Sequence, residues 1–140
     1  MKKLKWKMIS LLFVLAMVIG ILPVTVLAAD GDVTVNVGGV ALTVNYGDIV
    51  YAKTEASGNV TTADASQDDY NIKFEIVDTE PTLTLKDATI NNTHGDGVSA
   101  NGYNLVIIGV DTEKEGANDI SGSNSAIKVC GNITIKGKLG

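Results

Sequence analysis

The sequence contains no arginine, one histidine, one cysteine, one tryptophan and two prolines among its 140 residues. The single Cys130 cannot form an internal disulfide, and we expect it to be a small, partly buried residue. The single His94 excludes a triad or a histidine-based metal site within this chain, so we expect a solvated corner there. Sixteen acidic residues against 11 basic ones argue against a nucleic-acid-binding surface.

The first 28 residues have the pattern of a secretory signal peptide. Four lysines precede an apolar run from Met8 to Leu22, and Val26-Leu27-Ala28 provides a cleavage site. The competing interpretation is an uncleaved anchor, because an apolar segment of this length could just span a bilayer. We expect cleavage, since Pro23 interrupts the apolar run. The product is then secreted or held at the cell surface, without further membrane contact.

Cleavage also changes the charge of the chain. Four of the eleven lysines leave with the signal, so seven remain against 16 acidic residues and the formal net charge becomes −9. The remaining residues 29–140 are too few for two ordinary hydrophobic cores.

Alternating apolar and polar residues predict an all-β chain with almost no helix. Val33–Val37 and Val40–Val44 alternate on either side of Gly38-Gly39, which predicts a hairpin whose turn needs positive φ. Further strands are expected at 49–53 and around Phe74, where we expect a core position. The segment 54–69 is rich in Ala, Ser, Thr and Asp and predicts a polar loop.

From Thr82 onward the sequence repeats itself. Residues 97–109 match residues 126–137 when Tyr103 is treated as an insertion, so the offset is 29 positions before Tyr103 and 28 after it. Leu83-Thr84-Leu85 matches the second half of the unit once more. A further related pair of short segments lies at 88–91 and 118–121.

Such a repeat predicts a β-solenoid, in which each unit buries few side chains and depends on its neighbours. We expect stacked columns of Leu83, Leu105 and Ile133, and of Leu85, Ile107 and Ile135. Gly102 and Gly131 should lie at corners, and Asn104 and Asn132 should hydrogen-bond the backbone of a neighbouring unit. The alternative is an antiparallel sandwich of similar short strands.

The runs 81–90, 95–98 and 126–135 resemble bacterial secreted proteins described as carbohydrate-binding domain-containing. The resemblance covers about residues 70–140 and implies a right-handed parallel β-helix with a surface or extracellular role. It supplies no defined binding residues.

Three segments are therefore expected. Residues 1–28 form the signal peptide, 29–80 an amino-terminal β-hairpin region, and 81–140 the first turns of a β-helix. We expect this helix to be incomplete at the C-terminus, because Gly140 follows the last strand almost directly. The alternative is a short protein that covers its open end by self-association.

No catalytic residues, metal or cofactor are expected. Four aspartates, Asp87, Asp96, Asp111 and Asp119, occupy corner positions where Asp is an ordinary turn residue. Asp96, or the acidic loop at Asp68 and Asp69, offers oxygen ligands for weak calcium binding, but neither matches a defined calcium loop.

Sugar binding calls for aromatic faces beside planar polar groups. Tyr46, Tyr51, Tyr70 and Tyr103 are the tyrosines. Tyr103 is expected to project because it is inserted at a corner, with Asn101 and Asn104 beside it as candidate carbohydrate contacts.

The sequence thus favours a non-catalytic scaffold or adhesin-like module that contacts an extracellular polysaccharide or a cell-surface glycan. The first alternative is the front end of a β-helical polysaccharide lyase or glycosidase whose active site lies beyond residue 140. The second is a purely structural stalk.

Overall fold

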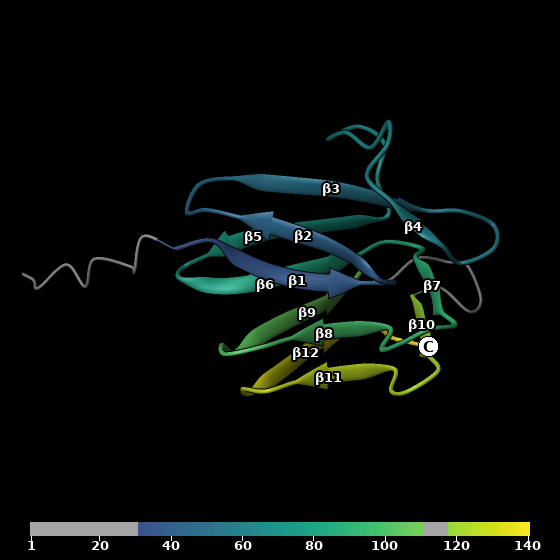
Figure 1. The fold of residues 1–140 in the computed structure, drawn as a ribbon. Coiled ribbons are helices and arrows are strands. Elements are labelled where there is room, and N and C mark those ends of the chain that lie inside the picture. Colours follow the sequence, from purple (N-terminus) through teal and green to yellow (C-terminus); the bar gives the residue numbers. More distant parts are fainter. Residues whose placement is uncertain (1–30, 111–117) are drawn as a thin grey trace, which may run out of the picture.

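The computed structural model describes residues 31–110 and 118–140, which form an all-β fold of twelve strands without a helix (Figure 1). The predicted signal peptide, residues 1–28, and Asp111 lie outside the described residues. Nowhere in the described ranges is there a helix long and apolar enough to cross a membrane.

The strands belong to three mixed or small sheets. The first contains, in order, β2 (Val40–Val44), β1 (Val33–Val37), β8 (Val98–Ala100) and β11 (Ile127–Val129). The second contains β4 (Val60–Thr61), β3 (Ile49–Thr54), β5 (Ile72–Val77), β6 (Glu80–Leu85), β9 (Leu105–Gly109) and β12 (Ile133–Gly137). β7 (Thr89–Asn92) and β10 (Asp119–Gly122) form the third, which lies at one end of the two larger sheets (Figure 1).

The amino-terminal hairpin is confirmed. β1 and β2 pair antiparallel with Val37 opposite Val40, so Gly38 and Gly39 make a two-residue turn. Their φ angles are 57° and 86°, a conformation that glycine adopts without steric cost.

The sequence repeat is also confirmed as a pattern of parallel pairing. Val98 lies opposite Ile127 and Leu105 opposite Ile133, which are the predicted offsets of 29 and 28 residues. β7 and β10 pair in the same sense, with Ile90 opposite Ile120. We call β6–β8 the first repeat and β9–β11 the second repeat, and β12 begins a third.

One predicted column is wrong by two residues. Leu83 lies opposite Ile107, not Leu105, and Leu85 lies opposite Gly109. The position of β6 is set by its hairpin with β5, in which Leu83 faces Phe74. Because side chains on a strand alternate with a period of two, a slip of two residues leaves every apolar side chain on the core face. The apolar pattern therefore cannot distinguish the two registers.

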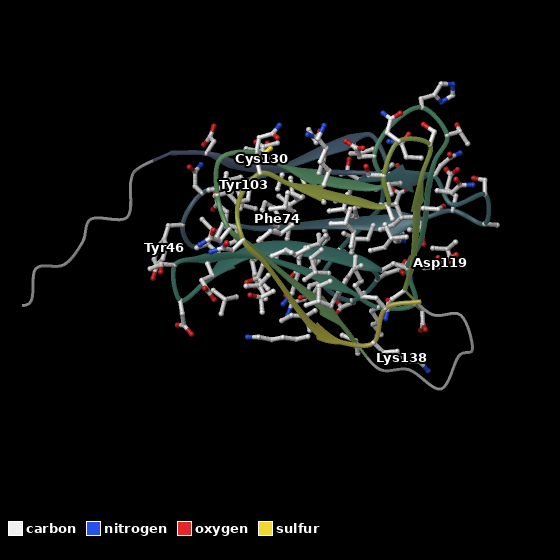
Figure 2. The ribbon with its side chains drawn as sticks, turned by 90° about the horizontal axis from the view of Figure 1, so that it is seen from below. Tyr46, Phe74, Tyr103, Asp119, Cys130 and Lys138 are labelled. Carbon is white, nitrogen blue, oxygen red and sulfur yellow. The ribbon has the colours of Figure 1, made fainter. Side chains whose placement is uncertain are left out.

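A single apolar core lies between the two larger sheets. It contains residues from both predicted regions, 29–80 and 81–140, among them Val35 and Phe74 from the first and Leu83 and Leu105 from the second. Phe74 is fully buried, as predicted, and points into the space between the sheets (Figure 2).

Every strand of the first repeat is covered on one side, which we call the capped side. β6 pairs with β5 and β8 pairs with β1, both antiparallel. The backbone of β7 is covered by the loop before β4, because the amide N of Asn91 donates to the carbonyl O of Gly58 at 2.9 Å. The amino-terminal strands thus close this end of the core.

The opposite side, formed by β10, β11 and β12, is uncovered, and we call it the open side. Ile133 and Ile135 are 41% and 50% exposed. Their partners in the preceding strand, Leu105 and Ile107, are 0% exposed. The core of the described residues is therefore closed at one end and exposed at the other.

Side-chain bonds tie the repeats together. Asn118 is 1% exposed. Its Oδ1 accepts from the amide N of Ala88 at 3.3 Å, and its Nδ2 donates to the carbonyl O of Val110 at 3.0 Å and of Lys138 at 3.2 Å. One buried amide thereby joins three successive levels of the chain.

The corner before β12 is equally close-packed. A Cβ at Gly131 would lie 2.3 Å from the carbonyl O of Tyr103, so only glycine fits there. As predicted, the backbone of a neighbouring repeat is bonded by asparagine, since the amide N of Asn132 donates to Oδ1 of Asn104 at 2.9 Å.

Candidate functional site

The larger sheet presents its second face away from the core, and strand register decides what lies on it. Along β5, Ile72 and Phe74 are buried, so Lys73 and Glu75 point the other way. The pairings then align one residue from each of five strands in a row across this face: Tyr51, Lys73, Thr84, Ile108 and Lys136. We call this surface the outer face.

A hollow of about 260 Å³ lies on the outer face. Its lining mixes charged, hydroxyl and aliphatic side chains: Lys73, Glu75, Val77, Asp78, Glu80, Thr82, Thr84, Val106, Ile108 and Lys136. Such a lining offers both apolar contact and hydrogen bonds, which is the combination that small polar ligands need.

An ion pair crosses the floor of the hollow. Nζ of Lys73 and Oε1 of Glu75 are 2.5 Å apart. The hydrogen bond to Glu75 raises the pKa of Lys73 above its ordinary value, while partial burial acts in the opposite direction. Lys73 is therefore a fixed cation, oriented by Glu75.

The turn that borders the hollow has an unusual backbone. Asp78 and Thr79, between β5 and β6, have φ angles of 49° and 74°. Positive φ is costly for a β-branched residue such as threonine, and conformations of this kind are found most often at binding sites.

Two tyrosines meet beside the hollow. The ring centroids of Tyr51 and Tyr70 are 5.1 Å apart and the rings are tilted by 49°. Tyr51 lies directly opposite Lys73 across the β3–β5 ladder. Both tyrosines are partly exposed, so a flat aromatic surface adjoins a fixed charge and a row of hydroxyl groups. The sequence alternation in 49–54 and 72–77 could have placed Tyr51 on this face, but not Tyr70, which lies outside both strands.

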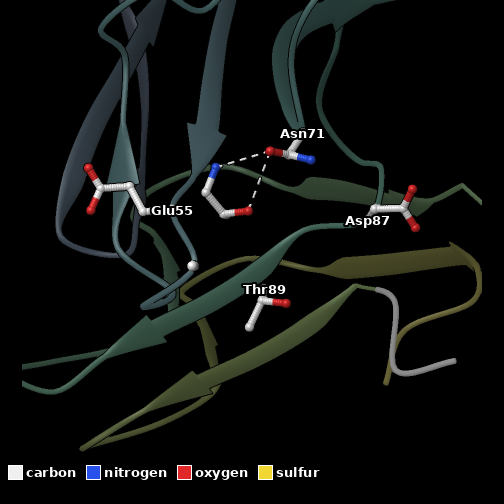
Figure 3. A pocket seen from close by; sticks show the side chains of 6 residues that line it. Glu55, Asn71, Asp87 and Thr89 are labelled. Carbon is white, nitrogen blue, oxygen red and sulfur yellow. Dashed lines mark hydrogen bonds between the residues drawn. The ribbon is translucent and has the colours of Figure 1, made fainter. Parts of the chain in front are cut away.

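A second hollow, of about 290 Å³, lies where β3 ends and β7 begins (Figure 3). Glu55, Asp87 and Thr89 line it together with Thr54, Ala56 and Asn71. Asn71 is already occupied: its Oδ1 accepts from the N and Oγ1 of Thr54 at 3.2 and 3.4 Å, and its Nδ2 donates to the carbonyl O of Lys86 at 3.1 Å. The polar groups of this hollow mainly hold corners of the chain together.

The predicted carbohydrate contacts lie elsewhere and serve the fold. Tyr103 does not project as expected: it is half-buried against the core, and its hydroxyl donates to the carbonyl O of Thr34. The inserted residue reaches the β1 strand because the capped side lies directly over this corner. Burial raises the pKa of Tyr103 to about 12.

The two candidate asparagines bond the next repeat. Asn104 accepts from the backbone of Asn132, as described above, and Oδ1 of Asn101 lies 3.2 Å from Sγ of Cys130. Cys130 itself is exposed, not partly buried as expected, because no strand covers the open side. His94 is exposed, as expected for a solvated corner.

The calcium candidates are not brought together. Asp68 is exposed, and Asp69 forms an ion pair with Lys53. Oδ1 of Asp96 is buried without a hydrogen-bond partner in the structure, while its backbone O accepts from Nδ2 of Asn92 at 2.8 Å. Within the described residues, no three His, Cys, Asp or Glu side chains are grouped so that they could hold a metal ion.

The remaining corner aspartates are separate. Asp87 lines the second hollow with a φ of 51°, typical of a turn residue, and Asp119 is exposed on β10. No family model, curated protein or solved structure matches this chain.

Proposed function

We propose that the chain is an exported, non-catalytic scaffold: the capped end of a right-handed parallel β-helix. Parallel pairing of β6 with β9, of β7 with β10 and of β8 with β11 supports this proposal, because each repeat follows the path of the one before. Crossovers between parallel strands of one sheet are right-handed in about 98% of cases, which supports the handedness.

One observation carries the proposal, namely the contrast between the two ends of the core. The capped side is closed by antiparallel strands, whereas the open side exposes Ile133 and Ile135 at positions that are fully buried one repeat earlier. A unit of this kind terminates a stack of repeats at one end and accepts a further repeat at the other.

The experiment is to insert a second copy of residues 110–137 directly after Gly137, since Gly109 and Gly137 are equivalent positions. The added repeat should cover Ile133 and Ile135. We expect a higher free energy of unfolding and a larger urea m-value, because more apolar surface is buried in one cooperative unit.

The matched control carries the same insertion with the equivalents of Ile120, Ile127, Ile133 and Ile135 changed to serine in the added copy. If both insertions leave the stability and the m-value of the original chain unchanged, the open side does not accept a repeat and the β-helix proposal fails.

A second function, carbohydrate binding, is favoured by the outer face. Tyr51 and Tyr70 offer partly exposed rings, and Lys73, Glu75 and the neighbouring threonines offer oriented polar groups beside them. We propose that this surface contacts an extracellular polysaccharide or a cell-surface glycan, with the sugar rings over the tyrosines.

Pull-down on cellulose, chitin and peptidoglycan tests this function. The double variant Tyr51→Ala, Tyr70→Ala should reduce the bound fraction about tenfold, since aromatic stacking contributes roughly 1–3 kcal/mol per ring in comparable cases. Tyr46→Ala is the control, because Tyr46 is 69% exposed but lies away from the hollow. Absence of binding to all three, or equal loss in the control, would remove this proposal.

A further inference from the structure

The open side is a surface of defined composition. Its two edge strands are β11 and β12, and beyond them no strand pairs in the described residues. Ile127, Val129 and Leu139 are only partly buried there, and Ile133 and Ile135 are largely exposed. The surface therefore combines unpaired backbone N–H and C=O groups with uncovered aliphatic side chains.

β12 has few of the features that prevent edge strands from pairing. Proteins protect such edges with proline, with several charges or with very short strands. β12 is five residues long, contains no proline, and carries one charge, Lys136. On the capped side, by contrast, the last strand of the larger sheet is β4, which has two residues.

We propose that the open side binds the open side of a second copy of this chain, with β12 antiparallel to β12 of the partner about a two-fold axis at Ile135. In this register Ile135 lies opposite Ile135 of the partner, and Thr134 lies opposite Lys136. Like charges are not paired, and two β-branched residues meet at the centre.

This arrangement continues an interface already present in the molecule. β12 stacks on β9 with Ile135 opposite Ile107, and a second β12 would cover the other edge in the same manner. A two-fold contact uses the same surface on both copies, so it closes at a dimer. A head-to-tail contact is disfavoured because the strands of the first repeat are already covered on the capped side.

The proposal does not depend on carbohydrate binding or on the chain forming part of a longer β-helix. It requires only the uncovered strands and isoleucines of the open side. The repeat insertion is judged by stability and the pull-down by binding, whereas this proposal is judged by mass, so their failures are distinguishable.

The first test is sedimentation velocity on the chain expressed with its own signal and purified from the exported fraction. We expect a reversible dimer. Ile135→Lys should raise the dissociation constant by roughly 100-fold or more, because a buried, unpaired charge would lie at the two-fold axis. Ile49→Lys is the control: Ile49 is 46% exposed on β3, far in sequence and sheet order from β12, and should leave the dimer intact.

Circular dichroism should show that Ile135→Lys keeps its β-structure, since Ile135 is half exposed in the single chain. A wild-type chain that is monomeric at high concentration would overturn the proposal. So would an Ile135→Lys variant that dimerises as strongly as the wild type, because the contact would then lie elsewhere.

The register has its own test. In a Cys130→Ser background, Ile135→Cys should form an intermolecular disulfide with added oxidised glutathione, since directly opposed residues of an antiparallel pair lie within disulfide range. Ile49→Cys in the same background should not. Equal cross-linking of both variants would show random collision and contradict the two-fold contact.

Discussion

Leu105 and Ile133 are equivalent residues in two environments. They lie opposite each other in parallel strands, yet Leu105 is 0% exposed and Ile133 is 41% exposed. β9 has a neighbour on each side, whereas β12 has one. In a fold built from thin stacked layers, the stability that an apolar side chain contributes is thus set by the layers beside it more than by its own identity.

Truncation at these two positions should give the largest difference between the two environments. Leu105→Ala should lower the free energy of unfolding by about 3 kcal/mol, because it leaves a cavity in a packed core. Ile133→Ala should cost roughly 1 kcal/mol, because much of that side chain is already hydrated. Urea unfolding at low protein concentration, where the chain is monomeric, measures both. Equal losses would mean that the open side is covered within one chain.

Asn118 sharpens the comparison, because it links the first repeat to the last residues of the open side. Asn118→Ala should lower the stability by about 2 kcal/mol, since it leaves the amide of Ala88 and two carbonyl groups without their partner. Asn104→Ala is the control and should cost at most about 1 kcal/mol, because Asn104 is exposed. A loss for Asn118→Ala no larger than the control would contradict the proposed link between levels.

The smallest effect concerns the attachment of the capped side at Tyr103. Tyr103→Phe should cost about 1 kcal/mol at neutral pH through loss of the hydrogen bond to Thr34. The pH dependence has a definite sign. The pKa of Tyr103 is about 12 in the folded chain and 10.0 as the model value, so the stability from the neutral phenol is complete below pH 10 and declines as the pH rises toward 12.

Thermal unfolding between pH 9 and pH 12 measures this decline, and Tyr103→Phe should reduce it. Tyr46→Phe, at an exposed tyrosine, is the matched control. If Tyr103→Phe and the wild type lose stability in parallel over this range, Tyr103 does not carry the effect.

The predictable part of the fold was local. Alternation around Gly38-Gly39 predicted the hairpin, and the offsets of 29 and 28 residues predicted which strands of the two repeats pair. Both depend on short-range patterns that one face of a strand must satisfy. The register of β6 could not be predicted, because shifts of two residues satisfy the same pattern and the choice is made by the β5–β6 hairpin.

The candidate site was harder to predict for a similar reason. Tyr103 was singled out because it interrupts a repeat, but the hairpin packed above it turns that insertion into an anchor for β1. Tyr51 and Tyr70 stand 19 positions apart and have no common motif. They meet only because β3 and β5 pair antiparallel, which brings the end of the polar loop back over β3.

The sequence by itself determined the all-β class, the amino-terminal turn and the stacking of the repeated strands, because alternation and glycine conformation act within a few residues. Tertiary structure alone decided which end of the core is covered, where the first repeat sits and which tyrosines share a surface. Those features depend on contacts between distant segments, and the same isoleucine is buried or exposed according to whether another strand lies beside it.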